Sequence, residues 1–356
     1  MQNIYHIIFI AFIVSSSTIN AFFFEKKGLI LIPSVAFRDH SSQEKSPADW
    51  NLHNQGWYYE ENPIQAFLME KSLELVVRKD LDHDRVKMFT AEGEEKKDLC
   101  INGLSRSMCT KTDNEGRLKN TFTMANHEIE TLRQTGSGGG KVLFQASVRN
   151  TNIQGTGEIF LCDDNGITFI SDIDDTIKIT EVTSSTQTLI NTFSGDFKAV
   201  EGMSEIYRHW EKEYNATFAY LTASPDQLYP FLREFFDREG FPAGSAHMRH
   251  FTWLDKNFIT FFMSSSYMTK KTETLQMFLQ NTRNRRFVLL GDVFQKDPDI
   301  YAGAYAQYPD RIEKIFIRKY DNDVVGQERL ETVFKDIPRH KWATFEKGSD
   351  LPRNIF

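Results

Sequence analysis

Two carboxylates at alternate positions could do chemistry in the stretch Gly166–Thr180, which reads GITFISDIDDTIKIT. Asp172 and Asp174 follow a short apolar run, and in an extended chain alternate side chains project to the same side. A buried strand that ends in carboxylates is typical of an open α/β sheet, in which sites gather at the carboxyl ends of the strands. Such a pair could hold a metal ion and share the roles of nucleophile and general acid or base. A solvated acidic turn would have the same sequence, so the ends of the other strands decide between the two.

Polar groups follow two more strand-like runs in this half of the chain. The run ATFAYL leads to Thr222, and the run FVLL leads to Asp292, with Asp297 five residues later. Between these runs, Lys271 lies at the start of a predicted helix. Because parallel strands present their carboxyl ends at one edge of a sheet, we expect these groups to meet the first pair of carboxylates.

Together these groups suit phosphoryl transfer from a phosphomonoester. Asp172, ionised at neutral pH, would attack phosphorus and form an aspartyl phosphate, which water would then hydrolyse. Asp174 would protonate the leaving oxygen and then activate the water, a role that requires its pKa to be raised toward neutrality. Lys271 and Thr222 would bind the phosphate oxygens.

A divalent cation is expected at the same edge, because the substrate is dianionic and must be neutralised before a carboxylate can approach it. Mg²⁺ prefers carboxylate and carbonyl oxygens. The predicted ligands are Asp172, Asp174, Asp292 and Asp297. No Cys/His spacing resembles a zinc site.

The elements that must position these groups divide the chain into four parts. We expect a signal peptide at residues 1–21, a mostly-β N-terminal domain at 22–165, a catalytic domain at 166–320 and a C-terminal tail at 321–356. After Gly166 strands alternate with helices, a pattern that predicts a parallel sheet covered by helices. The fold class is therefore α/β, preceded by a small β-sandwich or barrel.

The motifs resemble those of haloacid-dehalogenase superfamily phosphatases and, more closely, the actin-patch-protein type of phosphatidate phosphatase. The resemblance covers about Gly157–Arg318 and rests on SDIDDTIKIT, YLTASPDQLYPFLREFF, KKTETLQ and RRFVLLGDVFQKDPDIY. It implies a Rossmann-like, haloacid-dehalogenase-like sheet and the Mg²⁺-dependent release of phosphate from phosphatidate, which leaves diacylglycerol. The spacing in that family favours Lys271 as the catalytic lysine, although Lys270 stands beside it.

Phosphatidate lies at a membrane surface, so peripheral contact with lipid is expected. Phe251–Met263, FTWLDKNFITFFM, has eight large apolar residues and could form a membrane-facing loop, although a buried strand and helix would have the same composition. Two other functions stay open: a phosphatase for a soluble phosphomonoester, and a phosphatidate-binding module without turnover. A net charge of −7 argues against general nucleic-acid binding.

The N-terminus predicts a location in the secretory pathway or outside the cell. An apolar run, Ile7–Val14, precedes a plausible cleavage point after Ala21, and no other segment is long enough to span a membrane, so the mature chain would have no transmembrane span. In that setting Cys100 and Cys109 could close a small loop and leave Cys162 free.

A single N-glycosylation sequon, Asn215-Ala216-Thr217, belongs to the same prediction. It has a meaning only if the chain passes through the secretory pathway.

Overall fold

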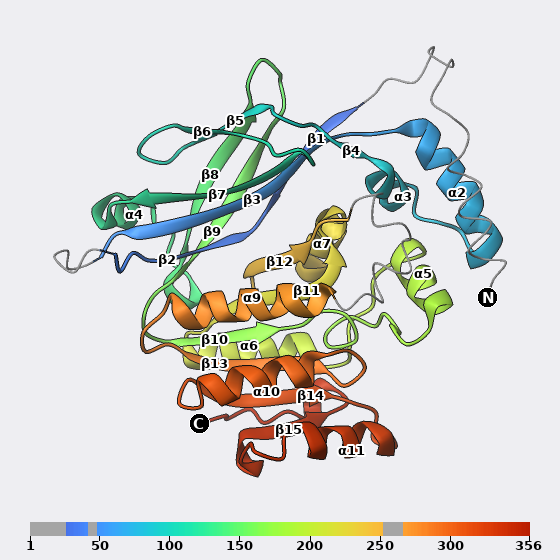
Figure 1. The fold of residues 1–356 in the computed structure, drawn as a ribbon, viewed down its shortest axis with the longest axis vertical. Coiled ribbons are helices and arrows are strands. Elements are labelled where there is room, and N and C mark those ends of the chain that lie inside the picture. The colour runs from blue at the N-terminus through green and yellow to red at the C-terminus, as the bar shows by residue number, and fades with distance from the viewer. Residues whose placement is uncertain (1–25, 42–47, 252–265) are drawn as a thin grey trace.

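The computed structural model describes residues 26–41, 48–251 and 266–356, which build two β-sheets and the helices around them (Figure 1). The predicted signal peptide and all but the first residue of Phe251–Met263 lie outside the described residues. Phe251 itself is buried in a small apolar cluster. The mixed α/β architecture with a mostly-β N-terminal region agrees with the sequence prediction.

The N-terminal sheet has nine strands and is antiparallel except where β2 pairs with β9. Its strands alternate buried and open positions, as in β8, where Val142, Phe144 and Ala146 face the core. The sheet curls until β6 approaches β7, and so it is one continuous sheet around one core. The strands are β1 (Lys27–Ile32), β2 (Ser34–Arg38), β3 (Trp50–Glu60), β4 (Glu92–Gly93), β5 (Asp98–Asn102), β6 (Met108–Lys111), β7 (Arg117–Met124), β8 (Lys141–Val148) and β9 (Gln154–Cys162).

Three helices accompany this sheet: α2 (Pro63–Val77), α3 (His83–Thr90) and α4 (Asn126–Leu132). The first two begin with side-chain caps, since Asn62 accepts from a backbone amide of α2 and Asp82 accepts from two amides of α3. They leave the sheet between β3 and β4 and reach toward α5 (Ser185–Phe193) of the second half (Figure 1).

The second sheet has six parallel strands in the order β12-β11-β10-β13-β14-β15. Counted along the chain, this order is third, second, first, fourth, fifth, sixth, so the direction of winding reverses between β10 and β13. Ligands of open α/β sheets bind at the carboxyl ends of the strands where this reversal occurs. The strands are β10 (Ile167–Ser171), β11 (Thr217–Pro225), β12 (Ser245–Arg249), β13 (Arg286–Asp292), β14 (Ile312–Arg318) and β15 (Trp342–Phe345).

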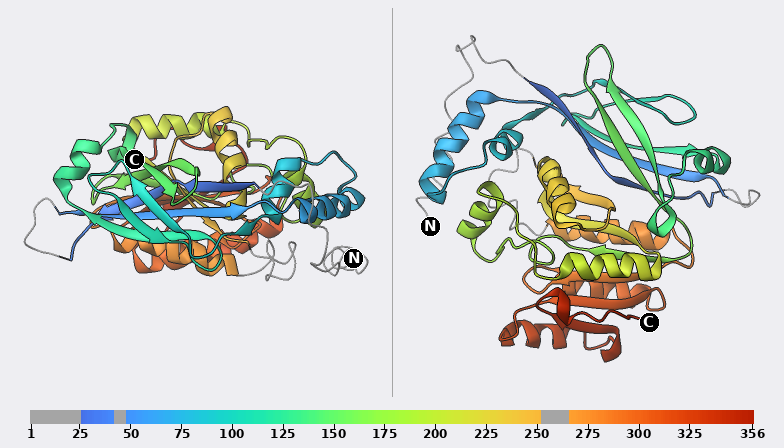
Figure 2. Two further views of the ribbon diagram at one scale, coloured as in Figure 1. Left: turned by 90° about the horizontal axis from the view of Figure 1, so that it is seen from above. Right: turned by 180° about the vertical axis from the view of Figure 1, so that it is seen from behind.

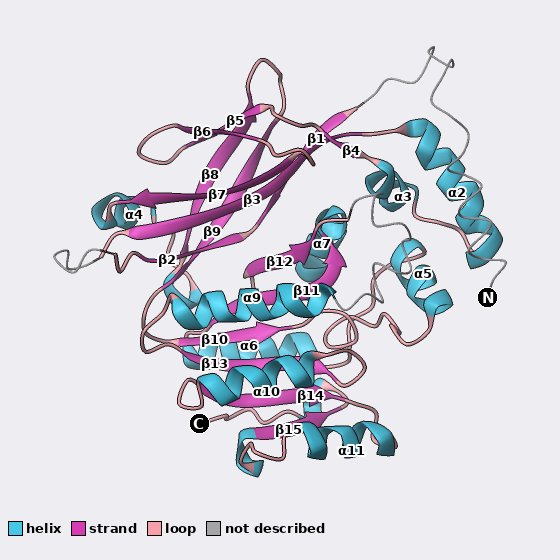
Figure 3. Ribbon diagram, viewed as in Figure 1, coloured by secondary structure: helices cyan, strands magenta, loops and turns pink. Residues whose placement is uncertain are grey.

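Helices cover both faces of the parallel sheet, as the views from above and from behind and the colouring by secondary structure make clear (Figures 2 and 3). Phe169 of β10 packs in one core with residues of α6 (Met203–Tyr214) and α7 (Tyr229–Glu239), whereas Ile170 packs in the other. That second core takes residues from α9 (Ser266–Gln280), α10 (Asp297–Gln307) and α11 (Val324–Val333). Because both faces are covered, every residue of β10 is buried.

Residues 321–356 contribute α11 and the edge strand β15, which pairs with β14. The sheet therefore extends past residue 320, where the sequence predicted a tail. None of the described helices is long and apolar enough to cross a membrane.

A turn of four residues, 163–166, joins the two sheets and is held by two arginines. Arg38 donates to both carboxylate oxygens of Asp163 at 3.0 Å. Arg285 donates to the carbonyls of Asp163 at 2.6 Å and Asn165 at 2.5 Å. The sheets also share apolar packing, since Trp57 of β3 lies in the same core as Phe169.

Candidate active site

Asp172 comes directly after β10 and is completely buried. Its amide donates to the carbonyl of Leu290 in β13 at 2.9 Å, so the backbone is fixed at the point where the strand order reverses. Lys271 Nζ donates to Oδ1 at 2.6 Å, and Thr176 Oγ1 donates to Oδ2 at 3.0 Å. The carboxylate therefore has one cationic and one neutral partner.

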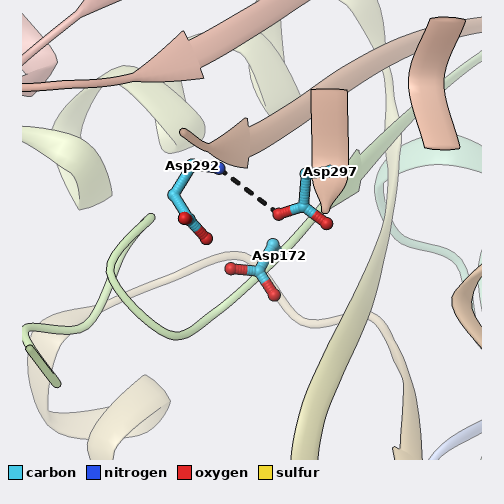
Figure 4. Close-up of side chains that lie close together, drawn as sticks. All are labelled: Asp172, Asp292 and Asp297. Carbon is cyan, nitrogen blue, oxygen red and sulfur yellow. Dashed lines mark hydrogen bonds between the residues drawn. The ribbon is translucent and has the colours of Figure 1, made fainter. Parts of the chain in front are cut away.

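Asp292 is the last residue of β13 and Asp297 is the first residue of α10, so the two carboxylates flank the connection between these elements. The Asp292 amide points at Asp297 Oδ2 across 3.3 Å, and Asp292 Oδ1 accepts from the amides of Phe294 at 2.6 Å and Gln295 at 2.7 Å (Figure 4). Gly291 makes this approach possible, because a Cβ there would lie 2.6 Å from Cβ of Asp297. The close approach of the two carboxylates thus depends on a glycine directly before Asp292, at the end of β13.

Lys271 of α9 joins these carboxylates to Asp172. Its Nζ donates to Asp297 Oδ1 at 2.7 Å in addition to Asp172, and only 3% of its surface is exposed. Burial opposes the charged ammonium, but the neighbouring carboxylates outweigh it and raise the pKa of Lys271. Of the two adjacent lysines, Lys271 is the one that enters the site, whereas the pKa of Lys270 is lowered by burial and by the charge of Lys119.

The three carboxylates could hold a metal ion. One oxygen each of Asp172, Asp292 and Asp297 lie within 4.8 Å of one another, and the three side chains face each other (Figure 4). Asp292 Oδ2 is buried and has no hydrogen-bond partner among the described residues. Three carboxylates against the one ammonium of Lys271 leave two negative charges, which a divalent cation would balance. An all-oxygen donor set of this kind fits a hard cation.

The crowding of charge also appears in the pKa values. Burial, followed by the charges of Asp297 and Asp174, raises the pKa of Asp172 to about 8 in spite of Lys271. Burial and the neighbouring Asp297 raise the pKa of Asp292 well above its usual range. Both shifts describe the metal-free cluster, in which Lys271 is the one cation among the described residues that forms an ion pair with the clustered carboxylates.

Asp174 lies outside the three-carboxylate group, although the sequence predicted it as a ligand. Its Oδ1 forms an ion pair with Lys178 Nζ at 2.8 Å and accepts a hydrogen bond from Thr180 Oγ1 at 2.7 Å. Its Oδ2 accepts from Thr222 Oγ1 at 2.8 Å and Ser224 Oγ at 2.6 Å. Burial opposes ionisation, but Lys178 and these hydroxyls outweigh it, so the pKa of Asp174 is lowered rather than raised.

The sequence prediction named Thr222 as a phosphate-binding hydroxyl, but in the structure that hydroxyl donates to the carboxylate of Asp174. It did not name Lys178 or Thr180, although both stand in the motif stretch that contains Asp174. The missing signal is conformational. Asp175 adopts a left-handed φ of 56°, and its carboxylate accepts from the amides of residues 180 to 182, which folds the chain back over Asp174.

Comparison with known proteins gives the site a context. Residues 167–319 match the family described as "Phosphatidate phosphatase APP1, catalytic domain". An uncharacterized protein of Schizosaccharomyces pombe is 33% identical over 196 residues, which are 54% of this chain and 31% of that protein. Phosphatidate phosphatase APP1 of Saccharomyces cerevisiae is 29% identical over 178 residues, which are 49% of this chain and 28% of that protein. The match thus spans about a third of the length of these relatives. A solved carbohydrate acetylesterase from Xanthomonas citri aligns at 8% identity over 91% of this chain and 69% of its own, with a TM-score of 0.32, too low to indicate a shared fold.

Proposed function

Because residues 167–319 match the family of phosphatidate phosphatase APP1 catalytic domains, we propose that this protein is a Mg²⁺-dependent phosphatidate phosphatase. It would hydrolyse phosphatidate to diacylglycerol and phosphate, with a Rossmann-like domain of the haloacid-dehalogenase type. One observation carries the proposal: within the matched region, Asp172, Asp292 and Asp297 form a buried cluster with Lys271 where the strand order reverses.

In the first step Asp172 attacks phosphorus through one carboxylate oxygen. The new bond makes an aspartyl phosphate, and the bond from phosphorus to the lipid oxygen breaks. Lys271, already 2.6 Å from Asp172 Oδ1, is placed to hold a phosphate oxygen beside the nucleophile. Mg²⁺, held by Asp172, Asp292 and Asp297, would neutralise the charge of the substrate.

Asp174 would serve as the general acid and base. Its ionised state suits the second step, in which it takes a proton from the water that attacks the aspartyl phosphate. To protonate the lipid oxygen in the first step, it must carry a proton and give up its ion pair with Lys178. Thr222 and Ser224 are then free to donate to phosphate oxygens instead of to Asp174.

Phosphate release from phosphatidate in detergent micelles tests the proposal, with Mg²⁺ or with chelator, for the wild-type protein and for Asp172→Asn. We expect release only from the wild-type protein with Mg²⁺. Release from a soluble monoester but not from the lipid would show that the substrate is a soluble phosphomonoester. Binding of phosphatidate without release from either compound would indicate a binding module.

We propose further that the protein works in the secretory pathway or outside the cell, at the surface of a membrane. A disulfide between Cys100 of β5 and Cys109 of β6 and an exposed Asn215 in a sequon support this location. A shift in mobility after glycosidase treatment, absent in Asn215→Gln, is expected for protein from eukaryotic cells. An unshifted wild-type protein that fractionates with the cytosol would contradict it.

A further inference from the structure

Helix α3 and its cap residue bind a short segment of the second half, residues 192–197, which we call the bridging segment. The Asp82 amide at the start of α3 donates to the carbonyl of Phe193 at 2.6 Å. Arg85 Nη1, from the same helix, donates to the carbonyls of Thr192 at 3.1 Å and Gly195 at 2.9 Å. Arg85 is only 5% exposed, so these bonds are made away from water.

One aromatic ring of the bridging segment, Phe197, contacts both this arginine and a lysine of the active site. The guanidinium carbon of Arg85 lies 4.0 Å from the centroid of the Phe197 ring, and Lys178 Nζ lies 4.8 Å from it. All three side chains are buried. Cations over an aromatic face attract it most strongly when water is excluded, as it is at this position.

Lys178 then contacts the proposed acid/base. Its Nζ lies 2.8 Å from Asp174 Oδ1 and also donates to Thr180 Oγ1, which donates to the same oxygen. The backbone of Lys178 forms β-bridges with Asp174 on one side and with Ala199, just past the bridging segment, on the other. The position of the Asp174 carboxylate is thus set by the same strand-like piece that carries Lys178.

We propose that Lys178 is a positioning residue for Asp174, and that Phe197 and Arg85 hold Lys178 in place. The inference rests on the proposed role of Asp174 in proton transfer. It gives helix α3, which lies outside the matched residues 167–319, a part in catalysis: α3 fixes the bridging segment, and the bridging segment fixes the lysine.

Steady-state kinetics on phosphatidate micelles test whether these contacts act on Asp174. Four variants are measured: Lys178→Met, Lys178→Arg, Phe197→Leu and the double variant Lys178→Met/Phe197→Leu. Misplacing a proton-transfer group costs on the order of 10²-fold in kcat, so we expect that loss for Lys178→Met with KM nearly unchanged. Phe197→Leu should lose about tenfold, and the double variant should be no worse than Lys178→Met, because the two residues act in series. Lys178→Arg should recover part of kcat.

Arg85→Met is compared with Arg339→Met, which removes an exposed arginine and serves as a control for the loss of a stacked guanidinium. Arg339 also stacks on an aromatic ring, at 4.1 Å from Trp342, and donates to a backbone carbonyl, but it lies beyond α11. We expect Arg85→Met to lower kcat and Arg339→Met to leave it unchanged. The proposal would be overturned if the kcat losses of Lys178→Met and Phe197→Leu multiplied in their double variant. A raised KM with unchanged kcat in these variants would overturn it as well.

Hydrogen exchange provides a readout that needs no turnover. The amides of Thr180, Glu181 and Val182 donate to the Asp175 carboxylate in the fold-back over Asp174. Arg85→Met should speed their exchange about tenfold or more, and Arg339→Met should not. If Arg85→Met leaves that exchange unchanged, the contacts do not couple and the inference is wrong, whether or not the wild-type protein hydrolyses phosphatidate. A wild-type protein inactive on phosphatidate contradicts only the proposed function.

Discussion

Replacing Asp292 by asparagine should stabilise the metal-free protein while removing its response to Mg²⁺. Asparagine keeps the shape of the side chain, and its oxygen can still accept from the amides of Phe294 and Gln295. It removes one of three charges whose oxygens lie within 4.8 Å. Two unit charges at that distance repel by about 3.5 kcal/mol at an effective dielectric constant of about 20. Because raised pKa values already relieve part of this repulsion, we expect a gain of about 1–3 kcal/mol.

The free energy of unfolding, measured by urea titration in chelator and in Mg²⁺, checks this expectation. The wild-type protein should gain about 2.7 kcal/mol at a free Mg²⁺ concentration near 100 times Kd, and Asp292→Asn should gain almost nothing. Asp175→Asn is the matched control: this buried carboxylate accepts from three amides outside the cluster, so its loss should destabilise the protein and leave the Mg²⁺ response intact. An Asp292→Asn protein that is less stable than wild type in chelator, or that still responds fully to Mg²⁺, would refute the reasoning.

Three further expectations concern charge, acid and reduction. Lys271→Met should lower phosphate release by about 10²–10³-fold. By leaving buried carboxylates unpaired, it should also destabilise the protein by about 3–5 kcal/mol in chelator. Parallel urea titrations should show a smaller loss of stability when Mg²⁺ is present. Burial, aided by the charge of Lys270, lowers the pKa of His247 to about 3, so protonation of this ring favours the unfolded chain and its contribution to stability should fall as the pH drops below about 6.5, whereas the raised pKa values of Asp172 and Asp292 act in the opposite direction in chelator. Between pH 6.5 and 5 the stability of the wild-type protein relative to His247→Gln should therefore fall by about 1–2 kcal/mol; a difference that does not change with pH would be contrary to this. Reducing the bond between Cys100 and Cys109 should cost about 2–3 kcal/mol, measured as the difference in urea midpoint between the protein with and without reductant, with Cys100→Ser/Cys109→Ser insensitive to reductant.

Much of the catalytic half follows from local sequence. Alternation of strands and helices predicted the parallel sheet, and the rule that strand ends meet at one edge predicted that Lys271 and Asp292 would lie beside Asp172. Asp172 follows β10 directly, Asp292 is the last residue of β13, and Lys271 lies in the second turn of α9 rather than at the helix start that the sequence predicted, so their placement depends little on loop conformation.

The surroundings of Asp174 could not be predicted in the same way. They depend on a left-handed residue, Asp175, where the sequence offers aspartate rather than glycine, and on a lysine that returns to the site only because the chain folds back. The single curled N-terminal sheet could not be predicted from the sequence either, because pairings such as β2 with β9 join residues more than a hundred positions apart. Local periodicity identifies such strands but does not determine their partners.

The clamped turn between the two sheets has a consequence for motion. Arg38 and Arg285 hold its carboxylate and carbonyls, and β9 and β10 are separated by only residues 163–166. A hinge there would have to break both sets of bonds and split the core shared by Trp57 and Phe169. The two sheets should therefore tumble as one body in solution.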